Sequence, residues 1–204
     1  MRTIARVAAP AFQRLDVDER RRRLLALGAR LFTSHTYTEL SMSQIASEAG
    51  ISKALLYHYF PSKEAYFVAT LEKAAAELEE RTRPDPSLEP LEQLSASLDA
   101  YLGWVEDYTE SYAKMLRSAS AVPEVRSMLE RVRGETARRI IDGVRGENPA
   151  SPALRTAVNG WLWFMDGAIL DWVEHRDLDR RTLHGLLLGT LLGAVLTAGE
   201  SGLS

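Results

Sequence analysis

Apolar residues recur along most of the chain at intervals of three and four, which is the spacing of one face of an α-helix. Leu24, Leu27 and Leu31 form one such series, and a second runs from Phe67 to Leu78. Strand-like alternation of apolar and polar positions is absent. The pattern therefore predicts an all-α protein.

Glycine and proline mark the breaks between these helical stretches. Breaks fall at Gly50, at Pro61, within residues 83–90, at Pro123 and within residues 146–152. Counting between them predicts about nine helices, with ends uncertain by about two to four residues. The expected ranges are 17–34, 41–49, 53–59, 62–82, 88–108, 111–121, 123–145, 152–175 and 179–198.

Composition narrows the class of protein. The chain has 204 residues, 46% of them hydrophobic, which is enough to bury a sizeable core. It contains no cysteine, which excludes disulfides, thiol catalysis and cysteine-based zinc fingers. The most apolar run, residues 183–198, is shorter than the roughly 20 residues that span a bilayer. We therefore expect a cytoplasmic protein without a membrane segment.

The small net charge of -3 conceals an uneven distribution. Residues 1–63 hold 10 basic and 5 acidic side chains, and residues 64–204 hold the other 15 basic and 23 acidic ones. A basic front and an acidic rear indicate that the front faces a polyanion. Chance imbalance on a solvated surface is the alternative interpretation.

Residues 41–59 have the layout of a helix-turn-helix. Ser41 and Gln44 fit a capping box at the start of the first helix. Gly50 suits the left-handed conformation that ends this helix, and a second short helix follows. In a helix-turn-helix the second helix enters the major groove of DNA.

The second helix presents an unusual set of side chains to its surroundings. With Leu56 and Phe60 facing inward, the residues left outward or lateral are Lys53, Ala54, Leu55, Tyr57 and His58. Lys63 and the run Arg20–Arg23 sit near helix starts, where cations oppose the helix dipole but suit a phosphate. The alternative is that all of these charges are merely solvated.

The segment "RRRLLALGARLFTSHTYTELSMSQIASEAGISKALLYHYFPSKEAYF" resembles the DNA-binding domain of the TetR (tetracycline repressor-like) family of transcription regulators. The resemblance implies a homodimeric repressor with a variable ligand-binding domain, bound to a palindromic operator in double-stranded DNA. It divides the chain into a basic arm (1–16), a DNA-binding domain (17–67) and a ligand-binding and dimerisation domain (68–204). The DNA contacts that it implies are Ser43, Lys53, Ala54, Leu55, Tyr57, His58 and Lys63.

Two positions depart from the pattern of that family. Thr36 stands where glycine is usual, and Leu55 stands where threonine or serine is frequent. Leucine cannot donate a hydrogen bond to a base edge but can touch a thymine methyl group, so the operator sequence stays open. The basic arm, with Arg2, Arg6 and Arg14, is a further candidate for a groove or phosphate contact.

Small residues repeat every four positions in the last predicted helix, at Gly185, Gly189, Gly193 and Thr197. Such a stripe lets another helix approach closely. The family resemblance implies pairing through the last two helices, so we expect residues 152–175 and 179–198 to hold a homodimer. The alternative is a core helix of a monomer.

Large amphipathic side chains gather in the predicted rear helices and suggest a pocket for a small, mainly hydrophobic effector. The candidate lining residues are Tyr101, Trp104, Tyr108, Tyr112, Met115, Trp163 and Asp166. Asp166 shares a helical face with Asn159 by spacing, and Arg117 or a tyrosine hydroxyl is its candidate partner. Aromatic and methionine residues at helical spacing more often belong to a plain core, and most of these large side chains are expected to be core.

Other functions have little support in the sequence. No nucleophile–base pair, phosphate-binding loop or H-E-x-x-H motif is present, so no catalytic residue, metal site or cofactor is expected. Asp171, Glu174 and His175 near a helix end are better explained as a charged terminus than as metal ligands. An enzyme and a helical scaffold without a ligand remain the alternatives, and salt-dependent DNA binding separates both from a regulator.

Overall fold

The computed structural model describes residues 17–118, 122–146 and 149–199. It is all-helical, as the sequence predicts, and the described residues contain no strand. The described residues form nine helices, namely α1 (Val17–Ser34), α2 (Met42–Glu48), α3 (Lys53–Tyr59), α4 (Lys63–Arg81), α5 (Pro90–Asp107), α6 (Thr109–Ser118), α7 (Pro123–Arg145), α8 (Pro152–His175) and α9 (Arg180–Thr197).

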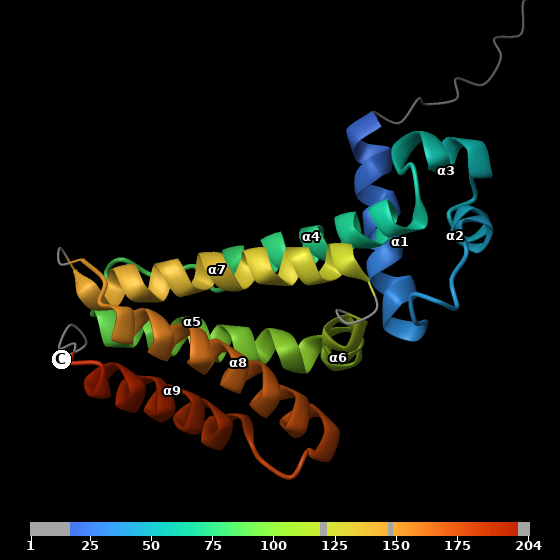
Figure 1. Cartoon of the computed structure of the whole chain (residues 1–204). Helices are drawn as coiled ribbons and strands as arrows, with labels where there is room; N and C mark the ends of the chain where they lie inside the picture. Colours follow the sequence, from blue (N-terminus) through green and yellow to red (C-terminus); the bar gives the residue numbers. More distant parts are fainter. Residues whose placement is uncertain (1–16, 119–121, 147–148, 200–204) are drawn as a thin grey trace, which may run out of the picture.

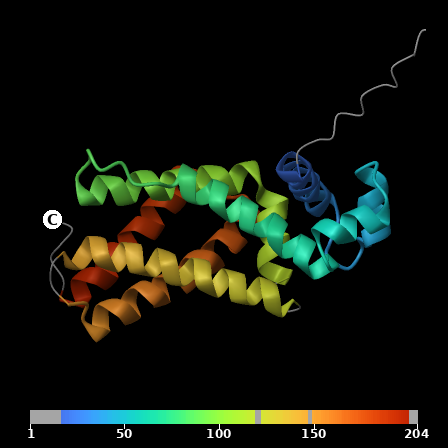
Figure 2. The same cartoon turned by 90° about the horizontal axis from the view of Figure 1, so that it is seen from above.

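The chain forms two parts that share one long helix. Helices α1, α2 and α3 lie together at one end of the molecule, and α5 to α9 form the larger bundle at the other (Figure 1). Helix α4 starts beside α1 and extends along the bundle, as the view from above also shows (Figure 2). A displacement of α4 therefore affects both parts.

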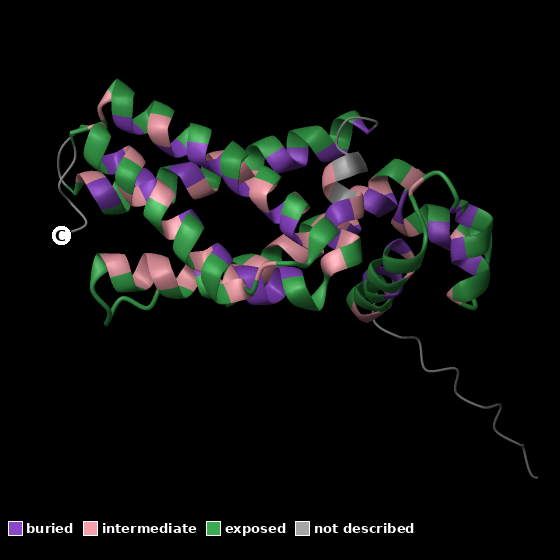
Figure 3. Cartoon of the chain, turned by 90° about the horizontal axis from the view of Figure 1, so that it is seen from below, coloured by how far each residue is buried: buried purple, intermediate pink, exposed green. Residues whose placement is uncertain are grey.

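Each part has its own cluster of buried side chains, and these lie on the helix faces that point inward (Figure 3). At the front, Ile45, Leu56 and Tyr66 are fully shielded from solvent. The first turns of α7 join this front cluster through Val125 and Met128. The front domain therefore rests on α7 as well as on α4.

The ends of α6 differ from the predicted range. The sequence predicts a helix from 111 to 121, whereas α6 begins at Thr109, directly after Tyr108. Tyr108 ends α5 with φ of -124° and ψ of 30°, so a single non-helical residue makes the break. The sequence does predict a break after residue 108, and the start of α6 differs from the predicted start within the expected end error of about two to four residues. The predicted basic arm and its arginines lie outside the described residues.

Helices α1 and α4 approach each other closely at Gly28. A Cβ atom placed there would lie 2.5 Å from Thr70 Oγ1 and 2.8 Å from the Tyr66 hydroxyl oxygen. Neither group can easily move away. The Tyr66 hydroxyl donates to the Leu24 carbonyl at 2.7 Å, and the Thr70 hydroxyl donates to the Tyr66 carbonyl at 2.8 Å.

Gly28→Ala is therefore expected to destabilise the protein by about 1–3 kcal/mol, as overpacking of a tight contact usually does. The matched control is Gly134→Ala in α7, where an added Cβ meets nothing within 4 Å. That control is expected to be neutral or to stabilise by about 0.5–1 kcal/mol, because alanine favours helix. Urea unfolding of the two variants measures both effects, and equal midpoints would contradict the close contact.

Candidate DNA-binding surface and effector pocket

Helices α2 and α3 form the helix-turn-helix that the sequence predicts. The Ser41 side chain accepts from the Gln44 backbone, and the Gln44 side chain accepts from the Ser41 backbone, so the capping box is present. Gly50 has φ of 64°, and the Ile51 N–H donates to the Ala46 carbonyl at 3.0 Å. These bonds end α2 and turn the chain toward α3.

The start of α3 is fixed by Ser52, whose hydroxyl accepts a hydrogen bond of 3.1 Å from the Leu55 N–H. The inward face of the motif consists of Ile45, Leu56 and Phe60, all buried. These three apolar contacts set the angle between α2 and α3. They hold the outer face of α3 in one orientation.

The outer face of α3 is free for contact with another molecule. Lys53, Ala54, Tyr57 and His58 are exposed, and Leu55 is half-buried. The Lys53 ammonium lies 5.8 Å from the centre of the Tyr57 ring, so the cation and the aromatic ring form one patch. Ser43 is exposed on α2. The assignment of these residues to base or phosphate contacts remains a prediction.

Lys63 lies differently from the other predicted DNA contacts. Its ammonium group donates to the carbonyls of Tyr37 at 2.9 Å and Leu40 at 3.0 Å, and lies 4.2 Å from the centre of the Tyr37 ring. Its side chain therefore ties the 35–41 loop to the start of α4. A phosphate contact by Lys63 stays a prediction, and any such contact shares the ammonium with these two carbonyls.

The arginines at the start of α1 are only partly available. Arg22 and Arg23 form ion pairs with Glu19 at 2.9 and 2.8 Å. The Arg21 guanidinium lies 5.4 Å from the centre of the Phe60 ring. Their neighbours within the protein thus account for much of this run, which the sequence attributed to phosphate contacts.

Thr36 shows why glycine is dispensable at its position. No positive φ occurs there, because Arg176 is the one non-glycine residue with positive φ in the described ranges. The Thr36 N–H and hydroxyl both donate to Glu39 Oε2, at 2.7 and 2.8 Å. Threonine therefore stabilises this turn by side-chain bonding.

The predicted effector residues separate into three places. Tyr101 and Tyr112 share a hydroxyl–hydroxyl hydrogen bond of 2.5 Å, and the Tyr112 hydroxyl donates to Asp166 Oδ1 at 3.4 Å. Trp104, Tyr108 and Tyr112 line a pocket described below. Trp163 lies on the outer surface, with 64% of its area exposed. The side chain of Met115 lies outside the described part of the structure.

Among the described side chains the charged partner of Asp166 is Arg133 of α7, and the side chain of Arg117 lies outside the described part of the structure. The Arg133 Nε donates to Asp166 Oδ2 at 2.8 Å, and its Nη2 lies 2.6 Å from the same oxygen. Burial nevertheless raises the pKa of Asp166 above its ordinary value. Asn159 is exposed and bonds to its own helix, so it does not share the inward face of Asp166 as the spacing suggested.

Removal of one member of this pair is expected to be costly. Asp166→Leu leaves the Arg133 charge mostly buried without its carboxylate, so a loss of about 3 kcal/mol is expected. The double variant Arg133→Met/Asp166→Leu is expected to regain most of that loss, because no charge remains. Chemical unfolding of the single and double variants tests this, and an unaffected Asp166→Leu protein would show that the pair contributes little.

A pocket of about 380 Å³ lies at the junction of the two parts of the molecule. Its walls come from α1, α4, the end of α5 and α6, and include Phe32, Phe67, Trp104, Tyr108 and Tyr112. The contributions of α1 and α4 were missed by sequence reasoning. No local sequence signal marks these residues as pocket-lining, because the wall forms only when α1 packs across α4 and α6. We call this cavity the junction pocket.

A groove of about 670 Å³ runs between α5 and α9 on the surface of the bundle. Leu91 and Leu188 contribute apolar surface to it, and Arg180, Arg181 and His184 contribute polar groups. None of the predicted effector residues lines this groove.

The outer face of α9 is apolar and has no covering within the described chain. Gly185, Gly189 and Gly193 have open space where a Cβ would stand. Leu186 is 48% exposed and Leu196 69% exposed. The opposite face of α9 is buried through Leu183, Leu187, Leu191 and Val195. A close-fitting partner helix therefore has room along the predicted stripe.

The described residues contain neither a membrane-spanning helix nor a cluster of metal ligands. None of their helices combines the length and the apolar character that a membrane crossing requires. No group of three or more histidine or acidic side chains within the described ranges could hold a metal ion.

An all-helical chain with an N-terminal helix-turn-helix and a separate helical bundle defines a class of DNA-binding regulators. Residues 24–70 match the family "Bacterial regulatory proteins, tetR family", and residues 90–193 match "Tetracyclin repressor-like, C-terminal domain". The second match covers more than half of the chain. The chain therefore belongs to the TetR family of helix-turn-helix transcriptional regulators, which bind DNA.

Similar proteins agree with this placement. The transcriptional activator FasR of Mycolicibacterium smegmatis is 31% identical over 101 residues, covering 48% of this chain and 46% of FasR. The chain thus spans less than half the length of that relative. The uncharacterized regulator YhgD of Bacillus subtilis is 26% identical over 179 residues, covering 83% of this chain and 93% of YhgD.

A solved structure resembles nearly the whole fold. The crystal structure of a TetR-family transcriptional regulator from Streptomyces coelicolor matches with a TM-score of 0.80 and 25% identity. The matched region covers 91% of this chain and 84% of that protein. The likeness extends over both the front domain and the bundle.

Proposed function

We propose that the chain is a homodimeric repressor that binds a palindromic operator and is released from it by a small effector. It acts in the cytoplasm, beside the chromosome, without a cofactor and without catalysis. The observation that carries the proposal is the exposed outer face of α3, where Lys53, Tyr57 and His58 are presented on a firmly packed helix-turn-helix.

The dimer part of the proposal is supported by the open glycine stripe and the exposed Leu186 and Leu196 of α9. Pairing of two copies through this face is isologous, so the two recognition helices become related by a two-fold axis. A two-fold axis requires two half-sites in inverted orientation, which is a palindromic operator.

The effector part is supported by the junction pocket, whose walls combine α1 with α4, α5 and α6. A ligand there contacts both the DNA-binding domain and the bundle. It favours one arrangement of α1 against the bundle and thereby changes the spacing of the recognition helices.

Activation instead of repression is the second candidate, because the relative FasR is described as an activator. Both roles share operator binding and differ in where the operator lies relative to the promoter. A reporter gene driven by the native promoter separates them, since removal of a repressor raises expression and removal of an activator lowers it.

Selection of sheared genomic DNA by the purified protein, at low and high salt, tests the proposal. Enrichment of an inverted repeat, with weaker recovery at high salt, is expected because phosphate contacts release counterions. Failure to enrich any sequence at either salt would contradict the proposal.

A further inference from the structure

The junction pocket has an aromatic wall in each part of the molecule. The front wall consists of Phe32 of α1, Tyr37 of the following loop and Phe67 of α4. The centre of the Phe67 ring lies 4.4 Å from that of Phe32 and 5.1 Å from that of Tyr37. These spacings are those of aromatic rings in mutual contact, so the three rings form one continuous surface.

The bundle wall consists of Trp104 and Tyr108 at the end of α5 and Tyr112 of α6. The centre of the Trp104 ring lies 5.1 Å from that of Tyr108 and 6.2 Å from that of Tyr112. Trp104 and Tyr112 are buried, whereas Tyr108 is exposed at the edge of this wall. A molecule that fills the pocket therefore meets aromatic surface from both parts of the protein.

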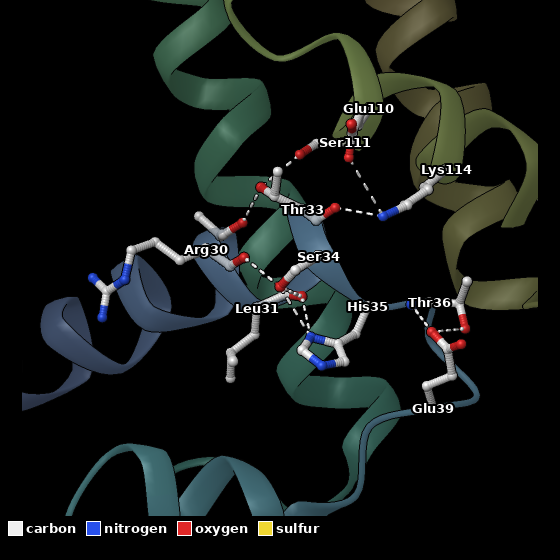
Figure 4. Close-up of polar contacts among 11 residues, drawn as sticks. Arg30, Leu31, Thr33, Ser34, His35, Thr36, Glu39, Glu110, Ser111 and Lys114 are labelled. Carbon is white, nitrogen blue, oxygen red and sulfur yellow. Dashed lines mark hydrogen bonds and ion pairs between the residues drawn. The ribbon is translucent and has the colours of Figure 1, made fainter.

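The charged side chains that line the pocket are mostly paired within the protein. Lys73 and Glu77 form an ion pair one helical turn apart on α4. The Lys114 ammonium group lies 3.9 Å from a Glu110 carboxylate oxygen and donates to the Thr33 carbonyl. Figure 4 shows Lys114 reaching toward both of these groups. A charged ligand would therefore compete with existing partners at three of the four charged residues in the lining.

Arg30 is the fourth charged residue of the lining. It is exposed, and Figure 4 shows its guanidinium directed away from Ser111 and Lys114. The hydroxyls nearby are engaged as well. That of Thr33 donates to the Ala29 carbonyl at 2.9 Å and is hydrogen bonded to that of Ser111 at 2.8 Å. The lining therefore offers a ligand mainly aromatic surface.

We propose that the junction pocket takes an uncharged molecule with a flat aromatic ring system, held between the front wall and the bundle wall. The proposal rests on the proposed function, because it names the chemical class of the effector for the same pocket. It narrows the expected hydrophobic effector, since a saturated molecule would leave the aromatic faces without the ring contacts that they favour. The volume of about 380 Å³ lies near the lower end of the range for ligand pockets, which suits a compact ring system.

Tyr37 connects the pocket to the DNA-binding surface. It lies on the loop between α1 and α2, directly before the helix-turn-helix. Its hydroxyl donates to Glu64 Oε1 at 2.5 Å, and the Lys63 ammonium lies 4.2 Å from the centre of its ring. A ligand ring between Tyr37 and the bundle wall therefore fixes this loop and the start of α4 against α5 and α6. Helices α2 and α3 follow the loop, so their favoured orientation relative to the bundle changes with the ligand.

Two probes with the same carbon skeleton test the aromatic requirement on the intact wild-type chain. 2-Naphthol and decahydro-2-naphthol are both uncharged and carry one hydroxyl, but only the first has aromatic faces. Calorimetry is expected to show 2-naphthol binding about tenfold more tightly, because ring contacts add to the burial of apolar area. A pocket that selects for apolar area alone favours the saturated probe, which has more of it. Equal affinities, tighter binding of decahydro-2-naphthol, or no binding of either probe would overturn the proposal.

A third probe tests the requirement for an uncharged ligand. 2-Naphthoate keeps the aromatic rings of 2-naphthol but carries a carboxylate in place of the hydroxyl. It is expected to bind about tenfold more weakly or worse, because transfer of a charge from water into an apolar pocket is costly unless a partner is free. Equal or tighter binding of 2-naphthoate would show that the ligand is an anion and would contradict this part of the proposal.

Variants then locate the ring. Tyr108→Leu keeps an apolar side chain in the bundle wall but removes its exposed ring, so the preference for 2-naphthol over its saturated partner is expected to fall to about threefold or less. The double variant Phe67→Leu/Tyr108→Leu removes a ring from each wall and is expected to abolish the preference. The matched control is Trp163→Leu, which removes an exposed ring of α8 outside the pocket. Retention of the full preference in Tyr108→Leu, or its loss in the control, would overturn the placement between the two walls.

The readouts separate this inference from the proposed function. Calorimetry needs no DNA, so it tests the aromatic site even if no operator is found. Conversely, operator binding by the ligand-free protein tests the regulator without the probe. When both hold, saturating 2-naphthol is expected to lower operator affinity about tenfold, because it fixes the loop before α2. An unchanged operator affinity at saturation would contradict the role of this pocket as the effector site.

Discussion

Tyr57→Ala is expected to lower affinity for the operator by about 1–3 kcal/mol, which is roughly a 5- to 150-fold change. Tyr57 is 41% exposed on the outer face of α3, so its truncation leaves the packed interior of the fold in place. Its ring supports the Lys53 ammonium at 5.8 Å, so truncation removes a contact surface and loosens a cation beside it.

The control for Tyr57 is a tyrosine of similar exposure in the bundle. Tyr108 is 44% exposed and packs on Trp104 with ring centroids 5.1 Å apart. Tyr108→Ala is expected to leave operator affinity unchanged when no effector is present. Fluorescence anisotropy with labelled operator compares the two variants, and circular dichroism confirms that both fold. Equal operator affinities of the two variants would contradict the placement of α3 in the DNA interface.

Gly189→Leu is expected to dissociate the homodimer. The residue lies in the middle of the open stripe of α9, where an added side chain blocks the close approach of a partner helix. Overpacking costs about 1–3 kcal/mol at one site, and two-fold symmetry introduces it twice, so about 2–6 kcal/mol is expected in total. Operator affinity falls with it, because a single protomer reaches only one half-site.

Gly143→Leu in α7 serves as the matched control for Gly189→Leu. Gly143 is also an exposed helical glycine with no atom near its missing Cβ, but it lies outside α8 and α9. Sedimentation velocity over a dilution series measures the dimer fraction of both variants. A Gly189→Leu protein that sediments as a dimer like the control would show that copies pair through another face.

Local signals in the sequence were sufficient to predict the helices and the helix-turn-helix. The Ser41–Gln44 capping box and the left-handed Gly50 depend on neighbours within a few residues, so their pattern is readable without the fold. The break between α5 and α6 was also predicted, and only its exact position differs, because no proline or glycine marks Tyr108.

Contacts between segments far apart in the sequence could not be predicted from local signals. The aromatic residues of α5 and α6 indicated a pocket, yet its other walls come from α1 and α4. The partner of Asp166 is Arg133, 33 residues away on α7, and spacing along one helix could not single it out. The contacts of Lys63 could not be predicted either. Its position near a helix start suits a phosphate, but its ammonium group also donates to two backbone carbonyls of the preceding loop.

We propose above that two copies of this chain bind one DNA duplex through paired recognition helices. Sedimentation equilibrium of the protein with a duplex recovered by genomic selection tests it most directly, with a scrambled duplex of the same composition for comparison. We expect two protomers on each selected duplex and much weaker binding to the scrambled one. A single protomer per duplex, or equal binding to both sequences, would contradict it.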